Sequence, residues 1–185
     1  MKRKSSSFGG GTGDINPQWF NMSAATVGAA YSDVATTLPR ERLPYGNRSQ
    51  VMEVLKVEFS AGTTQTVVPT AAVAASARFY LTTTTFATTE PTSAQMSGKV
   101  IARSSISVMA TAGSTGQGAI DTIKMVDCTD GAGNGVLVAT DQMFFGIIQT
   151  GATNPLTAGN VNCRILYRWK NVGLTEYIGI VQSQQ

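Results

Sequence analysis

The sequence predicts an all-β fold, an eight-stranded antiparallel jelly-roll sandwich, from three observations. Apolar residues with a period of two recur along residues 49–182, separated by turn signals that contain Gly or Pro. Thr and Val, which favour strands, are abundant, and no stretch shows a convincing helical period. The chain has 185 residues, whereas an immunoglobulin-like sandwich has about 100.

Six strands are predicted between residues 49 and 150, and two more follow after residue 161. The first six are expected at residues 49–60, 77–85, 99–110, 119–127, 136–140 and 143–150. In the first of them, one face is predicted to carry Val51, Leu55, Val57 and Phe59. The seventh strand, 162–170, has a largely basic face and an apolar face formed by Cys163, Ile165, Tyr167 and Trp169. We therefore expect Tyr167 and Trp169 in the core or an interface.

The eighth strand is predicted at the C-terminal end of the chain. A turn is expected at residues 171–173, and Ile178 and Ile180 then alternate with their neighbours up to residue 182. Cys128 ends the fourth predicted strand and Cys163 begins the seventh. Because those two strands are antiparallel neighbours in a jelly roll, we expect the two cysteines to lie close together as free thiols.

The residues before 49 are predicted to precede the jelly-roll domain, which would span 49–185. Residues 1–13 combine a Lys-Arg-Lys run with Ser and Gly, a composition typical of a disordered basic arm. Residues 14–48 are predicted to be an extended arm or linker, anchored by Trp19 and Phe20. The start lacks the apolar run of a secretory signal, and no run is long enough to span a membrane, so membrane insertion is not expected.

The charge excess of the chain is concentrated in this N-terminal part. The formal net charge is +3, and from residue 49 onward eight basic residues balance eight acidic ones. The candidate phosphate-binding residues are therefore the six basic residues before that point: Lys2, Arg3, Lys4, Arg40, Arg42 and Arg48. The alternatives are a solvated start without a role, and salt bridges at a subunit edge for the three arginines.

The composition favours a structural protein over an enzyme. The chain contains no histidine, the commonest general base and transition-metal ligand, and only two cysteines, and no nucleophile–base pair is visible. We therefore expect no catalytic site and no cofactor. Asp127, Asp130 and Asp141 surround one loop and form a candidate site for a hard cation, although turn-forming aspartates explain the pattern better.

Charged residues make up 14% of the chain, well below the usual quarter. Surfaces with little charge are typical of the centres of protein–protein interfaces. The composition therefore favours self-association, and the alternative is an ordinary all-β domain with a Thr-rich exterior.

Two stretches resemble the coat proteins of small circular single-stranded DNA viruses that encode a replication initiator. They are Pro39–Pro44 (PRERLP) followed by Gln50–Lys56 (QVMEVLK), and Tyr167–Leu174 (YRWKNVGL). The organisation is also similar, with a short basic start, a Gly/Ser linker and one jelly roll. The resemblance implies a virion protein whose copies, about sixty in the smallest (T=1) icosahedral shell, enclose a single-stranded DNA genome.

Two functions thus follow from the sequence. The first is a capsid protein that assembles with copies of itself around nucleic acid inside a host cell. The second is a trimeric binding module on the same fold, such as a receptor-binding head or a lectin-like domain. Uniform hollow particles would support the first function, and compact trimers the second.

Overall fold

The fold was analysed in a computed structural model of the chain. The structure describes residues 16–25, 32–38, 48–61, 66–67, 74–86, 91, 98–109, 118–119, 122–150 and 160–184. The predicted basic arm, residues 1–13, lies outside these ranges. Within them, no helix is long and apolar enough to cross a membrane.

The first sheet has the strand order β1-β11-β3-β8, and β9 also pairs with β3. Its strands are β1 (Gln18–Ala25), β3 (Arg48–Ala61), β8 (Thr122–Asp127), β9 (Val136–Val138) and β11 (Asn160–Gly173). β8 pairs with residues 56–61 of β3, and β9 pairs with residues 52–54. Both strands therefore lie along one edge of β3, and together they fill one strand position of the sheet.

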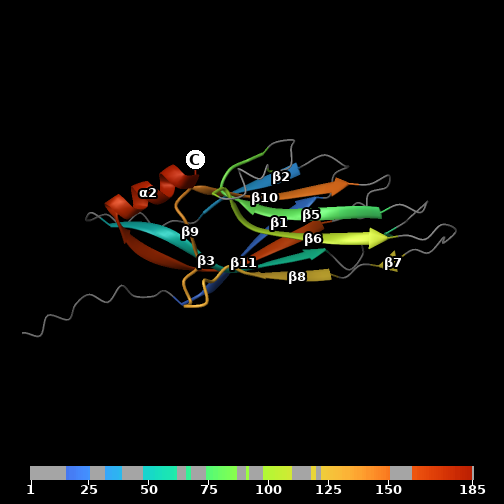
Figure 1. The fold of residues 1–185 in the computed structure, drawn as a ribbon, viewed down its shortest axis with the longest axis horizontal. Coiled ribbons are helices and arrows are strands. Elements are labelled where there is room, and N and C mark those ends of the chain that lie inside the picture. The colour runs from blue at the N-terminus through green and yellow to red at the C-terminus, as the bar shows by residue number, and fades with distance from the viewer. Residues whose placement is uncertain are drawn as a thin grey trace, which may run out of the picture.

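The second sheet has the strand order β2-β10-β5-β6. Its strands are β2 (Ser32–Thr37), β5 (Ala74–Thr82), β6 (Val100–Met109) and β10 (Gln142–Thr150). A separate pair is formed by β4 (Thr66–Val67) and β7 (Gly118–Ala119). The long strands of the two sheets pack face to face, and β7 lies at the opposite end of the molecule from α2, the C-terminal helix described below (Figure 1).

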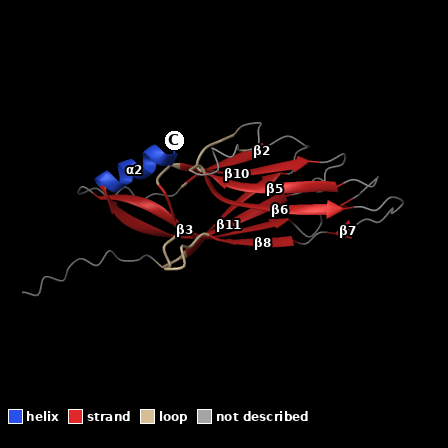
Figure 2. Ribbon diagram, in the orientation of Figure 1, coloured by secondary structure: helices blue, strands red, loops and turns tan. Residues whose placement is uncertain are grey.

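The path of the chain through these sheets is that of a jelly roll. Among the long strands the chain passes from one sheet to the other at each connection, except between β5 and β6, which are neighbours in the second sheet. Every pairing is antiparallel. The predicted all-β, antiparallel jelly-roll sandwich is therefore confirmed, and strands account for nearly all the regular structure (Figure 2).

The core lies between the two sheets and is built around three stacked phenylalanines. The ring centroid of Phe59 lies 5.8 Å from that of Phe79 and 5.9 Å from that of Phe145, so β3, β5 and β10 meet there. Side chains from both sheets surround this stack and are buried, among them those of Ile147 and Ile165. Burial of these apolar side chains provides the main driving force for closing the sandwich.

The predicted face of β3 was wrong, because the strand contains a bulge. The register with β11 shifts between Leu166 and Tyr167, which leaves Leu55 without a Cα partner. Val57 and Phe59 face the core as expected, but beyond the bulge Met52 and Val54 face it, in place of Val51 and Leu55. An extra residue in one strand reverses the side-chain alternation on its far side.

Strands also begin earlier in the chain than residue 49. β1 and β2 lie within the segment that was expected to be an extended arm, and they occupy edge positions of the first and second sheets. Their partners are β11 and β10, respectively. The sandwich therefore includes residues that the sequence interpretation placed in a linker.

The predicted turn at 171–173 and the eighth strand after it were wrong. β11 continues to Gly173, and the helix α2 (Leu174–Gln184) follows directly. Its inner face carries Tyr177, Ile180 and Val181, which pack against Val51 and Ala139 among others. These three residues recur at the i, i+3, i+4 spacing of a helix. The alternation of Ile178 with Ile180 fitted a strand, but the helical spacing buries more apolar surface.

Cys128 and Cys163 are free thiols, as expected, but the expected strand pairing was wrong. β8 and β11 both pair with β3 and lie on its two sides, so they run parallel to each other and are not neighbours. Burial, followed by the nearby Asp127 carboxylate, raises the pKa of the Cys128 thiol to about 11. Burial also raises the pKa of Cys163. Both thiols are therefore protonated at neutral pH and are poor nucleophiles.

Candidate nucleic-acid interface and contact surfaces

The six basic residues predicted to bind phosphate lie largely outside the described part of the chain. Lys2, Arg3, Lys4, Arg40 and Arg42 fall outside it, and Arg48 is described only as the first residue of β3, where its backbone opposes Gly173. Their role in nucleic-acid binding stays a prediction. In the described part of the chain, a candidate interface is formed by other residues.

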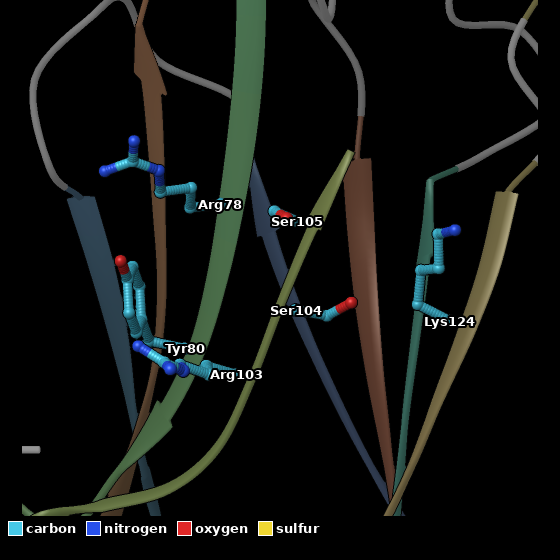
Figure 3. Close-up of a pocket in the computed structure, with 6 residues that line it drawn as sticks. All are labelled: Arg78, Tyr80, Arg103, Ser104, Ser105 and Lys124. Carbon is cyan, nitrogen blue, oxygen red and sulfur yellow. The ribbon is translucent and has the colours of Figure 1, made fainter. Parts of the chain in front are cut away.

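A basic groove lies where the second sheet approaches β8. It is lined by Arg78, Tyr80, Arg103, Ser104, Ser105 and Lys124, and its volume is about 560 Å³. Figure 3 shows Arg78, Tyr80 and Arg103 on one side of β6, and Ser104 on the side that faces Lys124. Three cationic side chains thus share one cavity, and no acidic residue is among the described residues that line it.

The strand register explains how the basic groove forms. Arg78 opposes Ser105, and Tyr80 opposes Arg103, so one outward face of β5 and β6 carries all four side chains. The intervening residues Ala77 and Phe79 are buried in the core. Lys124 comes from β8, which lies beside β6 at the same side of the sandwich. The sequence interpretation missed these cations because no single segment contains them; the outward position of Arg78 and Arg103 was the signal available.

A second charged site, centred on Glu53, holds together β3, β11 and the loop before β9. The Glu53 side chain is completely buried, and its Oε2 accepts a hydrogen bond from Nε of Arg168. Its Oε1 accepts one from the backbone N–H of Gly135 at 3.1 Å and lies 3.8 Å from Nζ of Lys170. Burial raises the pKa of Glu53, but the two hydrogen bonds and the two cations outweigh it and hold the pKa below 4.5. This arrangement is structural, because both carboxylate oxygens are engaged.

The four aromatic residues singled out in the sequence lie on β1 and β11. Phe20 packs against the core, and Trp19, on the opposite face of β1, is 42% exposed with the guanidinium of Arg164 4.6 Å from its ring centroid. Tyr167 is buried, and Trp169 is half-buried with an edge-on contact to it at 5.7 Å. Trp19 therefore belongs to the outer surface, whereas the other three belong to the core or its margin.

Two of the three aspartates considered as a cation site accept hydrogen bonds from their own loop. Asp127 Oδ1 accepts hydrogen bonds from the N–H and hydroxyl of Thr129, and the carboxylate of Asp130 accepts from the backbone of Ala132 and from Asn134. These hydrogen bonds hold the pKa of both carboxyl groups below the usual value. Across the described ranges, no group of three His, Cys, Asp or Glu side chains is placed to hold a metal ion. Turn formation accounts for Asp127 and Asp130.

Two separate elements each expose a pair of large apolar side chains. Ile123 and Met125, on the outer face of β8, are 60% and 57% exposed. Leu174 and Ile178, on α2, are 49% and 46% exposed. β8 and α2 lie in different parts of the molecule (Figure 1). Exposed apolar surface of this kind is typical of contact surfaces between proteins.

Comparison with solved structures shows that the fold is similar to that of polyomavirus VP1 proteins. The capsid protein VP1 of human polyomavirus 6, solved as a pentamer, is similar over 85% of this chain and 96% of that chain, with a TM-score of 0.57 and 9% identity. VP1 of human polyomavirus 7, also a pentamer, gives a TM-score of 0.53 at 9% identity and covers 83% of this chain and 95% of that one.

VP1 of human polyomavirus 12, solved in complex with 3′-sialyllactosamine, gives a TM-score of 0.52 at 10% identity. The similarity covers 84% of this chain and 100% of that chain. No protein-family model matches the chain, and no curated protein matches it. At these identities the likeness concerns the fold. The chain therefore has a jelly roll of the kind found in these VP1 proteins.

Proposed function

We propose that this protein is a viral capsid protein that assembles into a small icosahedral shell around nucleic acid, and that it resides in the virion. The observation that carries the proposal is the jelly-roll fold, which is similar to that of polyomavirus VP1 over most of both chains. The pentameric state of two of those proteins supports association with copies of itself, and the resemblance of residues 39–56 and 167–174 to small circular DNA virus coats supports a single-stranded DNA genome.

Two features of the described surface support self-association. Ile123 and Met125 on β8, and Leu174 and Ile178 on α2, form two separate apolar patches. Two different patches on one subunit suit contacts with more than one neighbour, as an icosahedral shell requires. The low fraction of charged residues, 14%, agrees with extensive subunit contacts.

Electron microscopy and light scattering of the purified full chain test the proposal. Sixty copies of a 19.4 kDa chain would form a particle of about 1.2 MDa, visible as uniform hollow spheres. Nuclease-resistant nucleic acid inside these particles would support packaging. Compact trimers in every buffer would contradict the proposal and favour the alternative, a trimeric binding module.

That alternative has one observation in its favour. Polyomavirus 12 VP1 and the VP1 of the trichodysplasia spinulosa-associated virus were solved with sialylated ligands, so this fold can bind glycans. A glycan-binding head would bind such ligands without forming particles. Particle formation therefore distinguishes the two functions more directly than glycan binding does.

A further inference from the structure

Most basic residues of the body gather in two places. Eight basic residues follow residue 48. Three of them are on β11 and face acids of β3: Arg164 lies 3.4 Å from Glu58, and Arg168 and Lys170 contact Glu53. Another three line the basic groove. Three of the eight basic residues of the body thus gather in one cavity.

The two arginines of the groove lie on the same outward face of adjacent strands. Arg78 opposes Ser105, and Arg103 opposes Tyr80, so the arginines are diagonal neighbours on adjacent strands. Diagonal neighbours lie about 7–8 Å apart, which long side chains can bridge by converging on a group between them. Arg78, Tyr80 and Arg103 already interact with other groups of the chain, which holds them in position. A guanidinium has several N–H donors and can contact a phosphate while it keeps one such partner.

The remaining lining suits the backbone of a nucleic acid better than its bases. Ser104 and Ser105 add hydroxyl donors to the lining, and Lys124 lies on the side of β6 that Ser104 faces. Tyr80 is buried and packs with Phe86, so its ring face is not available for stacking a base. Contacts to phosphate without base contacts carry no sequence information.

We propose that the basic groove binds the phosphodiester backbone of single-stranded nucleic acid, without regard to base sequence. This inference rests on the proposed function, because it places part of the packaged genome in the groove beside β6. Three charges on each of about sixty N-terminal arms give on the order of 180 positive charges, few beside the phosphates of a genome. The groove contributes three more cations per copy and so doubles that number.

The test measures the salt dependence of binding by the full chain, kept as dissociated subunits. Fluorescence anisotropy follows a labelled single-stranded oligothymidylate over a series of salt concentrations. Each phosphate contact contributes about 0.7 to the slope of log affinity against log salt. Arg103→Gln should lower the slope by about 0.7, and the triple variant Arg78→Gln, Arg103→Gln, Lys124→Gln by about 2.

Two controls separate the groove from total charge and from folding. Arg164→Gln removes an exposed arginine from the other sheet and should leave the slope unchanged. The double variant Arg78→Lys, Arg103→Lys keeps the charge and should retain the wild-type slope. An oligoadenylate should bind as tightly as the oligothymidylate, to within about threefold.

An unchanged slope in the triple variant would overturn the proposal, and so would an equal loss in Arg103→Gln and Arg164→Gln. The groove would instead be a glycan site if its variants lost saturable binding of 3′-sialyllactose while the salt slope for the oligonucleotide stayed the same. That result would also overturn the proposal. The outcomes are distinguishable from those of the proposed function, since the subunit assay does not need particles. Particles that form normally while the slope is unchanged contradict the groove alone; a groove-dependent slope without particles contradicts the shell alone.

Discussion

The Glu53 site gives the sharpest prediction about stability. Glu53→Gln keeps an oxygen that can accept the Gly135 N–H but removes the charge that faces Arg168 and Lys170. Removing one partner of a buried ion pair costs about 3–5 kcal/mol. The Arg168 and Lys170 side chains are 23% and 39% exposed, so water partly replaces the lost carboxylate. We therefore expect a loss near the lower end, about 3 kcal/mol of unfolding free energy.

Glu58→Gln is the matched control, because Glu58 lies on the same strand and also faces an arginine of β11. Its partner Arg164 is exposed, and the N–O distance is 3.4 Å. Exposed ion pairs contribute about 0–1 kcal/mol, so this variant should remain close to the wild type. Urea unfolding of dissociated protein, at a concentration low enough to exclude assembly, provides both free energies.

The pH dependence provides an independent check of the same site. The pKa of Glu53 lies below its ordinary value of 4.5 in the folded protein. A depressed pKa stabilises the fold above the unfolded-state pKa, and this contribution is lost as the pH falls through the folded-state value. The difference between wild type and Glu53→Gln should therefore be largest at neutral pH and shrink below pH 4.5. Equal costs for the two variants, or a difference that does not change with pH, would refute the reasoning.

Three further substitutions test the packing around this site and the helix. Gly135→Ala should cost about 2–3 kcal/mol of unfolding free energy in urea. A Cβ at Gly135 would lie 2.1 Å from the carbonyl oxygen of Val54, so the backbone would shift and the hydrogen bond from the Gly135 N–H to Glu53 would be lost. An unchanged unfolding midpoint would contradict this. Gln184→Ala should lower the unfolding free energy by about 1–3 kcal/mol, because the buried Gln184 amide hydrogen-bonds to the backbone of Leu137 and Ala139. Gln182 is exposed, so the control variant Gln182→Ala should melt at the wild-type temperature. Trp169→Ala should lower the unfolding free energy by about 3 kcal/mol, the lower end of the range for truncating an aromatic residue to Ala, because the ring is half-buried. A variant that melts at the wild-type temperature would disprove the packing role of Trp169.

The sequence predicted the class of fold because its strands carry a clear period of two, but it did not predict every face. The bulge at Leu55 is an example. Val54 and Val57 both face the core, a spacing of three that strict alternation forbids. Nothing in the residues themselves marks the extra position, which is set by the pairing with β11. The error therefore arose from register, a property of two strands rather than one.

The two ends of the sandwich were mispredicted for different physical reasons. In β1, every second residue faces the core: Phe20, Met22 and Ala24. Ala24 is small and Met22 is flexible, so the apolar pattern of this strand was weak. In α2, the spacing of Tyr177, Ile180 and Val181 was visible, but Ile178 and Ile180 fitted a strand as well. Short apolar runs leave helix and strand ambiguous. Tertiary contact with Val51 and Ala139 decides between them.

The basic groove shows why counting charge along the chain misses a candidate site. By segment, the chain has a basic start and a neutral body. In the folded chain the cations of β11 meet the acids of β3, since these strands are paired neighbours. The outward positions beside Arg78 and Arg103 are held by Ser105 and Tyr80. Positive charge is therefore neutralised along β11 and gathered where β6 approaches β8, an arrangement that strand order creates and composition does not reveal.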